Sequence, residues 1–335
     1  MMKRQRTVFL LAGAVLLVCM AMNVLVGSID IGFKEIMDIL INHDTASTKG
    51  FIVWKIRLPR AIAAALGGGC LAVAGLLLQV YFRNPIVGPF ILGISSGATL
   101  MVSIVMLTSV TIGMTLVNPF MCTLAAFVGA YGTMLIVLLI ANRVKNGVTL
   151  LIVGLMMGYL CHSVTSVLVA FAEKEKIKGF VLWQLGSFSG FKWSEIEILC
   201  IVGGLILVLV YFLAKPLNAF LLGEDYAASM GVNIRLFRML ILVSACALAG
   251  MITSMAGPVA FVGLAVPHMV RLLFATSDNR VLIPGAVLVG AMVISLCDFI
   301  ARMVFNPVEL PISAITAFFG APIVISLLLK RRTKI

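Results

Sequence analysis

Few residues that could perform acid–base, nucleophilic or metal chemistry lie within the long apolar runs of this sequence. Asp298 and Arg302 are four residues apart, which places them on one face of a helix, where a local ion pair would neutralise both charges. A proton relay through Asp298 would need a second carboxylate within such a run, and we find none. His162 lies in another run, and we expect a packed or hydrogen-bonded side chain there rather than a metal ligand.

The motifs of nucleotide-binding and metal-dependent enzymes are missing. The sequence contains no G-x-x-x-x-G-K-[ST] and no H-E-x-x-H, so it has no P-loop for ATP and no zinc-protease signature. Its three histidines are far apart, and its seven cysteines all lie in apolar runs without a C-x-x-C pair. We therefore expect no catalytic residue and no metal site in this chain.

The composition identifies the solvent that surrounds most of the chain. Of its 335 residues, 62% are hydrophobic and only 11% are charged, more apolar surface than a water-soluble domain can bury. Apolar runs of about 20 residues match the thickness of a bilayer, and period-two alternation is absent. The predicted fold is therefore all-α: one transmembrane domain over residues 1–335, with about ten membrane-spanning helices. The ten runs cover residues 8–27, 61–82, 90–110, 118–141, 148–171, 196–213, 236–256, 258–275, 281–304 and 311–329.

Basic residues predict the orientation. Ten spans place both termini on one side, and we interpret the first run as a retained helix rather than a signal peptide. If that side is the cytoplasm, the inner segments hold 15 of the 25 Lys and Arg residues but only three acids, as the positive-inside rule requires. The predicted location is the cytoplasmic membrane of a prokaryote, with both termini in the cytoplasm. Because the charges are scattered over short loops, nucleic acid is not an expected partner.

Two outer segments are long enough to form helices at the membrane surface. Residues 32–42 carry a helical stripe of apolar side chains, and residues 176–186 form a second candidate, followed by a Gly/Ser-rich loop.

Helix-breaking residues interrupt both halves of the chain. Asn84 and Pro85 follow the second span, whereas Pro258 and the pair Pro267-His268 interrupt a later run. In a membrane, irregular backbone persists only where protein buries it or where it lines a water-filled path. Two broken regions, one in each half, are typical of transporters built from inverted repeats.

A short polar segment between the sixth and seventh spans predicts a cytoplasmic helix at about 218–231. Glu224 and Asp225 follow Gly223, where acids complement the dipole of a helix start, and Gly231 is placed to end the helix. One predicted face forms a small apolar knob; it comprises Leu222, Tyr226, Ala227 and Met230.

Five blocks of sequence, in order, resemble the FecCD-type permease family, the membrane subunits of ATP-binding-cassette (ABC) importers for iron–siderophores, haem and vitamin B12. The resemblance covers nearly the whole chain after about residue 30. Its main segments are KIRLPR at 55–60, GLLLQ at 75–79, RNP at 83–85, LGISSGA at 92–98, LWQLGSFSG at 182–190, LGE at 222–224, GPVAFVGLAVPH at 257–268 and ELPI at 309–312.

The resemblance implies a set of partners. It implies a homodimer, or a pair with a close homologue, embedded in lipid, with ten helices in each subunit and a path along the dimer interface. Two cytoplasmic ATPase subunits, which bind ATP and Mg²⁺, would drive it, and a binding protein outside the membrane would deliver the cargo.

The resemblance also implies roles for individual residues. Arg57, Arg60 and Arg302 match outer-face arginines that dock the binding protein, although membrane anchoring or local ion pairing would also explain them. Asn146, Gly147 and Val148 match the inner gate; Gly147 and Val148 depart from the small hydroxyl residues of some relatives, so a hydrophobic constriction is the alternative. The remaining residues fall into two groups. The ATPase-coupling group is Leu222, Gly223, Glu224, Tyr226, Ala227, Met230, Gly231 and Arg238. The group at the path and its broken helices is Gln79, Asn84, Pro85, Pro258, Pro267 and His268.

The leading hypothesis is the permease of an ATP-driven importer for an iron(III)–siderophore, with cobalamin or haem as the alternative cargo. A rival from another class is an ion-coupled secondary transporter, which broken helices also fit. That rival predicts intramembrane carboxylates, for which only Asp298 qualifies.

Overall fold

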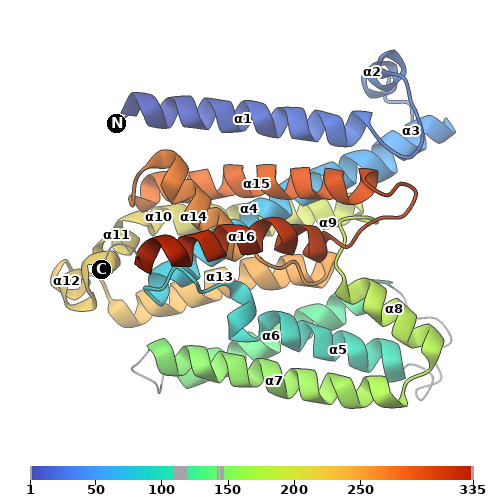
Figure 1. The fold of residues 1–335 in the computed structure, drawn as a ribbon. Helices are drawn as coiled ribbons and strands as arrows, with labels where there is room; N and C mark the ends of the chain where they lie inside the picture. Colours follow the sequence, from blue (N-terminus) through green and yellow to red (C-terminus); the bar gives the residue numbers. More distant parts are fainter. Residues whose placement is uncertain (1, 109–118, 142, 144–146, 333–335) are drawn as a thin grey trace.

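The computed structural model describes residues 2–108, 119–141, 143 and 147–332, and in these ranges the regular structure is entirely helical. The long helices run side by side as one bundle (Figure 1). Seven helices of the described part are long and apolar enough to cross a membrane, and three shorter apolar helices, α5, α14 and α16, accompany them. The predicted all-helical membrane fold is confirmed.

The first half of the chain contains α1 to α8 with two irregular helical turns. The segment from α3 to α4 is one continuous helical stretch because the π-helical turn η1 joins the two. The bounds are α1 Met2–Leu25, α2 Phe33–Ile41, α3 Thr48–Ile52, η1 Val53–Arg57, α4 Leu58–Tyr81, the 3₁₀ turn η2 Pro89–Leu92, α5 Ile94–Thr108, α6 Pro119–Ala141, α7 Gly147–Phe171 and α8 Lys174–Gln184.

The second half contains α9 to α16. A π-helical turn, η4, joins α9 to α10 in one span. The bounds are α9 Trp193–Ile198, η4 Leu199–Gly203, α10 Gly204–Phe212, α11 Ala214–Leu222, α12 Glu224–Ser229, α13 Ile234–Ala256, α14 Val262–Phe274, α15 Asn279–Met303 and α16 Ile312–Arg332.

The two halves pack in exchanged pairs. Helix α4 packs on α15 and α14, whereas α13 packs on α6 and α5. Helices α5, α6 and α7 all contact one another, and so do α14, α15 and α16. Helix α4 contacts α13, and this contact links the two groups. This exchange of partners is the arrangement that inverted-repeat halves predict.

Small residues make the close helix contacts of the core. Along α4, Gly68 lies so near Gly290 of α15 that a Cβ on either would overlap the backbone of the other. A Cβ on Gly75 would likewise overlap the backbone of Gly263 of α14. Because lipid removes the hydrophobic drive between spans, close packing of small residues is what holds such helices together.

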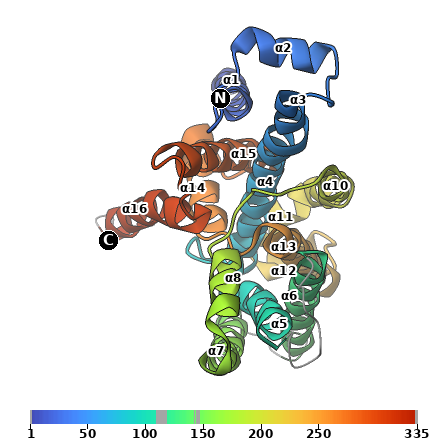
Figure 2. The ribbon, with the colours of Figure 1, turned by 90° about the vertical axis from the view of Figure 1, so that its right-hand side faces the viewer.

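The ends of the bundle differ. Helix α1 begins and α16 ends at the same end of the bundle as α11 and α12, which we call the terminal end, and α2 and α3 lie at the other, distal end (Figure 1). Viewed from the distal end, α2 lies outside the bundle, beyond α1 and α3 (Figure 2). Helices α2 and α8 occur at 33–41 and 174–184, where the sequence predicts surface helices.

Candidate coupling, docking and translocation sites

The predicted cytoplasmic helix at 218–231 is wrong in one respect, because the structure contains two helices there. Gly223 separates α11 from α12 with φ 140° and ψ 151°, a conformation that is essentially restricted to glycine. Gly231, at φ 84°, follows the end of α12. Glu224, in the first turn of α12, forms an ion pair with Arg238 of α13 at 2.5 Å between Oε2 and Nη2. This pair anchors α12 to the adjoining span.

The apolar knob is smaller than the sequence indicates. Leu222, Tyr226 and Met230 are exposed, whereas Ala227 is fully buried. The predicted stripe does not belong to one helix, because Leu222 ends α11 and Met230 caps the end of α12. Ala227 is the member that the fold buries. We therefore correct the coupling surface to the three exposed side chains.

The three predicted docking arginines lie at the distal end, but all are buried. Arg57 donates from Nη1 to the carbonyl oxygens of Val24 and Leu25 at 3.0 and 3.1 Å, and from Nη2 to that of Ile29. These bonds attach η1 to the end of α1 and the segment after it. A docking contact would need this side chain to leave its carbonyl partners.

A charged cluster joins four elements at the same end. Arg60 of α4 binds the buried Asp298 of α15, with 3.0 Å between Nη2 and Oδ1, and it also binds Glu309 at 2.7 Å. The predicted local pair is present but longer, at 3.6 Å between Arg302 Nε and Asp298 Oδ2. Arg302 instead donates to Asn23 Oδ1 of α1 at 2.6 Å. The carboxylate is thus shared by two spans rather than neutralised within one helix.

Only part of the predicted gate lies in the described residues. Asn146 lies outside them. Gly147 is the first residue of α7, and the Val148 side chain is exposed in the single chain. The proposed polar or hydrophobic gate stays a prediction.

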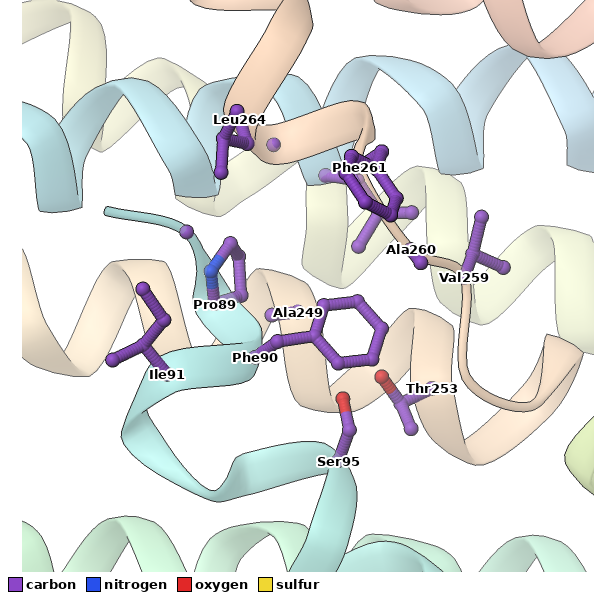
Figure 3. Close-up of a pocket in the computed structure, with 13 residues that line it drawn as sticks. Pro89, Phe90, Ile91, Ser95, Ala249, Thr253, Val259, Ala260, Phe261 and Leu264 are labelled. Carbon is purple, nitrogen blue, oxygen red and sulfur yellow. The ribbon is translucent and has the colours of Figure 1, made fainter. Parts of the chain in front are cut away.

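Two Gly-Pro segments converge on an apolar cavity of about 250 Å³. Gly88-Pro89 precedes α5 and Gly257-Pro258 precedes α14, so each break belongs to one half of the chain. Phe90 comes from the first segment and Phe261 from the second, with Ser95 and Thr253 beside the Phe90 ring (Figure 3). The broken backbone therefore lies inside the protein and lines a cavity, as intramembrane breaks require.

The breaks also shorten the spans that follow them. Helix α5 begins at Ile94 and α14 at Val262, so the expected runs 90–110 and 258–275 contain helices of only 15 and 13 residues. The predicted interruption at Pro267-His268 is wrong, because Pro267 lies inside the continuous α14.

The other predicted path residues fall at two places. Pro258 lines a polar cavity of about 270 Å³, which adjoins the apolar one through Phe90, Ser95 and Ala260. The rest, which are Gln79, Asn84, Pro85 and His268, line a third cavity of about 620 Å³ toward the terminal end. The six predicted residues therefore do not form one site in a single chain.

The polar cavity contains residues that the sequence interpretation did not select. Ser95, Thr99, His162, Thr165 and Gln184 line it, and His162 is exposed in the single chain rather than packed. Ser95, Thr99, His162 and Thr165 are polar residues within apolar runs, whereas Gln184 lies in the predicted surface helix. Polarity at one position of a single helix does not distinguish a cavity-lining residue from one that bonds its own backbone.

Ser95 also lies in a G-x-S-x-G pattern, Gly93–Gly97, which resembles a hydrolase nucleophile elbow. That elbow follows a strand, whereas a 3₁₀ turn precedes α5 here, and the described residues that line the cavity include no acid. The geometry gives no support to a hydrolytic triad.

Comparisons with known proteins agree with this geometry. A family model described as the FecCD transport family matches residues 15–330. The vitamin B12 import system permease proteins of Salmonella arizonae and Salmonella typhi are 36% and 35% identical over 290 residues, 86% of either chain in both cases.

Solved structures share the fold. A metal-chelate type ABC transporter in an inward-facing conformation matches with a TM-score of 0.83 and 25% identity, over 97% of this chain and 99% of the other. PsaBC from Streptococcus pneumoniae, in complex with Fab, matches with a TM-score of 0.53 and 18% identity, which indicates the fold alone. The chain belongs to the FecCD transport family and is the membrane permease subunit of an ABC importer.

Proposed function

We propose that two copies of this chain, or one copy and a close homologue, form the membrane path of an ATP-driven importer for a metal chelate. The observation that carries this proposal is α12. In and beside it, Leu222 at the end of α11, Tyr226 of α12 and the C-cap residue Met230 are exposed next to an anchored ion pair, in a chain that has no P-loop of its own. Such a knob suits a groove on a separate ATPase, which would bind ATP and Mg²⁺.

The proposed sidedness follows from charge and from the shared end of the bundle. Helix α1 begins and α16 ends at the same end of the bundle as α11 and α12 (Figure 1), and basic residues prevail in the loops on that side. We place this terminal end in the cytoplasm with the two ATPase subunits. The distal end, with α2 and α8, would receive a binding protein outside the membrane, and the chain itself would need no cofactor.

The polar and apolar cavities support a path on the face formed by α5, α7 and α16. His162 and Gln184 are exposed there, whereas the exposed side chains of α10 are apolar. Polar side chains toward lipid are costly, so this face is better suited to a second subunit and water.

Two cargoes have support. An iron(III)–siderophore agrees with the metal-chelate type of the solved transporter, and cobalamin agrees with the names of the relatives at 35–36% identity. Because of those relatives, cobalamin is the cargo to test first, and haem is the third candidate.

The test is uptake by proteoliposomes that contain the permease, its ATPase and its binding protein. We expect uptake of labelled cobalamin or ferric chelate to require ATP and all three components. Uptake driven by an ion gradient without the ATPase would instead support a secondary transporter. Competition between unlabelled cobalamin, ferric siderophore and haem would then identify the cargo, since only the true cargo should suppress the labelled signal.

A further inference from the structure

A cavity of about 620 Å³ that two arginines line lies toward the terminal end. It is lined by the end of α4, the loop after it, α11, α14, the start of α15 and α16. Its lining includes Arg83, Arg271 and His268 but, in the part of the chain that the structure describes, no Asp or Glu. We call it the basic cavity.

The two arginines are held in place by neutral groups. Arg271 donates from Nη1 to Gln79 Oε1 at 2.6 Å. Arg83 lies over the Phe220 ring, 5.1 Å from its centroid, and donates from Nη2 to the Phe220 carbonyl at 3.3 Å. Neither has an ion-pair partner among the described residues. A guanidinium has five N–H donors, so each of these arginines keeps donors that an anion could accept from.

A buried acceptor lies at the same cavity. Asn279 lines it, is fully buried, and has an Oδ1 without a hydrogen-bond partner in the described chain. Its backbone and side-chain amide groups both donate to Asn218 Oδ1 at 2.8 Å. Because a buried unsatisfied acceptor is costly, the site suits a ligand that brings a hydrogen-bond donor together with a negative charge.

We propose that the basic cavity binds a phosphate group that carries a hydroxyl or ammonium donor, with the arginines on the phosphate and Asn279 on the donor. The source is either a membrane phospholipid headgroup or a soluble phosphate ester. The lipid source has positional support, because exposed Leu221 and Leu272 also line the cavity and would accompany an acyl chain. The inference is independent of the proposed cargo and ATPase.

The first experiment titrates the purified full-length permease with phosphatidylglycerol and follows bound lipid by native mass spectrometry. We expect Arg83→Gln and Arg271→Gln each to weaken binding by about fivefold, since one arginine near a membrane surface contributes on that scale. Arg235→Gln is the matched control, because Arg235 is exposed on α13 outside the cavity. Arg83 is also exposed, so its variant tests the idea even if loss of Arg271 unfolds the protein.

The second experiment varies the ligand and leaves buried Asn279 intact. Phosphatidylmethanol keeps the phosphate but lacks the hydroxyl donor, so it should bind about fivefold more weakly than phosphatidylglycerol. Competition by glycerol phosphate or inorganic phosphate would assign the site to a soluble ester, and absence of competition would assign it to lipid. The proposal would be overturned if both arginine variants bound as tightly as the control and the original protein. This result would have to hold for both the lipid and the soluble phosphates.

Discussion

At the residue scale, the buried Asp298 separates what sequence spacing reveals from what only the fold reveals. The spacing of four correctly placed Arg302 beside it, but the shorter ion pair is with Arg60, 238 positions earlier in the chain. Local helix geometry constrains only neighbours within one or two turns. The packing of α4 on α15 supplied the stronger partner, and no pattern in either segment alone encodes it.

The same cluster changes how binding-protein docking should be tested. Reversing the charge of Arg60 would place a third carboxylate beside Asp298 and Glu309, and reversing Arg57 would break its bonds to the end of α1. Loss of docking in such variants would therefore report misfolding as readily as a lost contact. The docking role of Arg57, Arg60 and Arg302 stays a prediction.

We expect Asp298→Asn to destabilise the permease strongly. The change leaves the buried guanidinium of Arg60 with only the half-exposed Glu309, and breaking a buried pair in this way costs about 3 kcal/mol or more. The measurement is the thermal unfolding midpoint in detergent. Glu309→Gln is the control and should cost less than about 1 kcal/mol, because solvent screens its pair. Equal midpoints for the two variants would refute a structural role for the cluster.

At the level of single elements, the sequence predicted the position of α12 but not which of its side chains are exposed for coupling. The glycines and the acidic first turn predicted the start and end of this helix, and both glycines have positive φ in the structure. The sequence could not reveal that α11 precedes α12 as a separate helix, since helical propensity is similar on both sides of Gly223. Nor could it reveal which apolar residue faces inward, because that depends on the packing of α12.

The exposed knob formed by Leu222, Tyr226 and Met230 gives the sharpest test of coupling. The double variant Leu222→Glu and Met230→Glu should fold normally, because both side chains are exposed. It should lower ATP-driven uptake about tenfold or more, as expected when apolar anchors are removed from an interface. The measurement is uptake and ATPase activity of the reconstituted complex.

Ala227→Glu is the contrasting variant for that test. It buries a carboxylate without a partner, so we expect poor folding rather than clean uncoupling. Full uptake by the double variant would show that α12 only covers its own protein.

At the scale of the whole molecule, the inverted halves were predictable in outline and the cavities were not. The breaks at Pro85 and Pro258 indicated two related halves, and the exchanged packing of α4 and α13 agrees with that prediction. The contact of Gly68 with Gly290 joins helices that are far apart in the sequence. A glycine within one span gives no indication of its partner, so helix pairing, and with it the division into polar, apolar and basic cavities, required the structure.

The face of α5, α7 and α16 should be lined by water in the assembled transporter. His162 is exposed on α7 and shares its cavity with Ser95 and Gln184. In a Cys200→Ser background, which removes the exposed cysteine while the other six stay buried, His162→Cys should react with a water-soluble thiol reagent at least about tenfold faster than Ile201→Cys. Ile201 is 70% exposed on the apolar surface of η4 and α10, where lipid would exclude water and disfavour the reactive thiolate. The rates are measured by mass spectrometry on vesicles that contain the whole complex. Equal, slow labelling at both positions would mean that α7 faces lipid, and the path would then have to lie elsewhere.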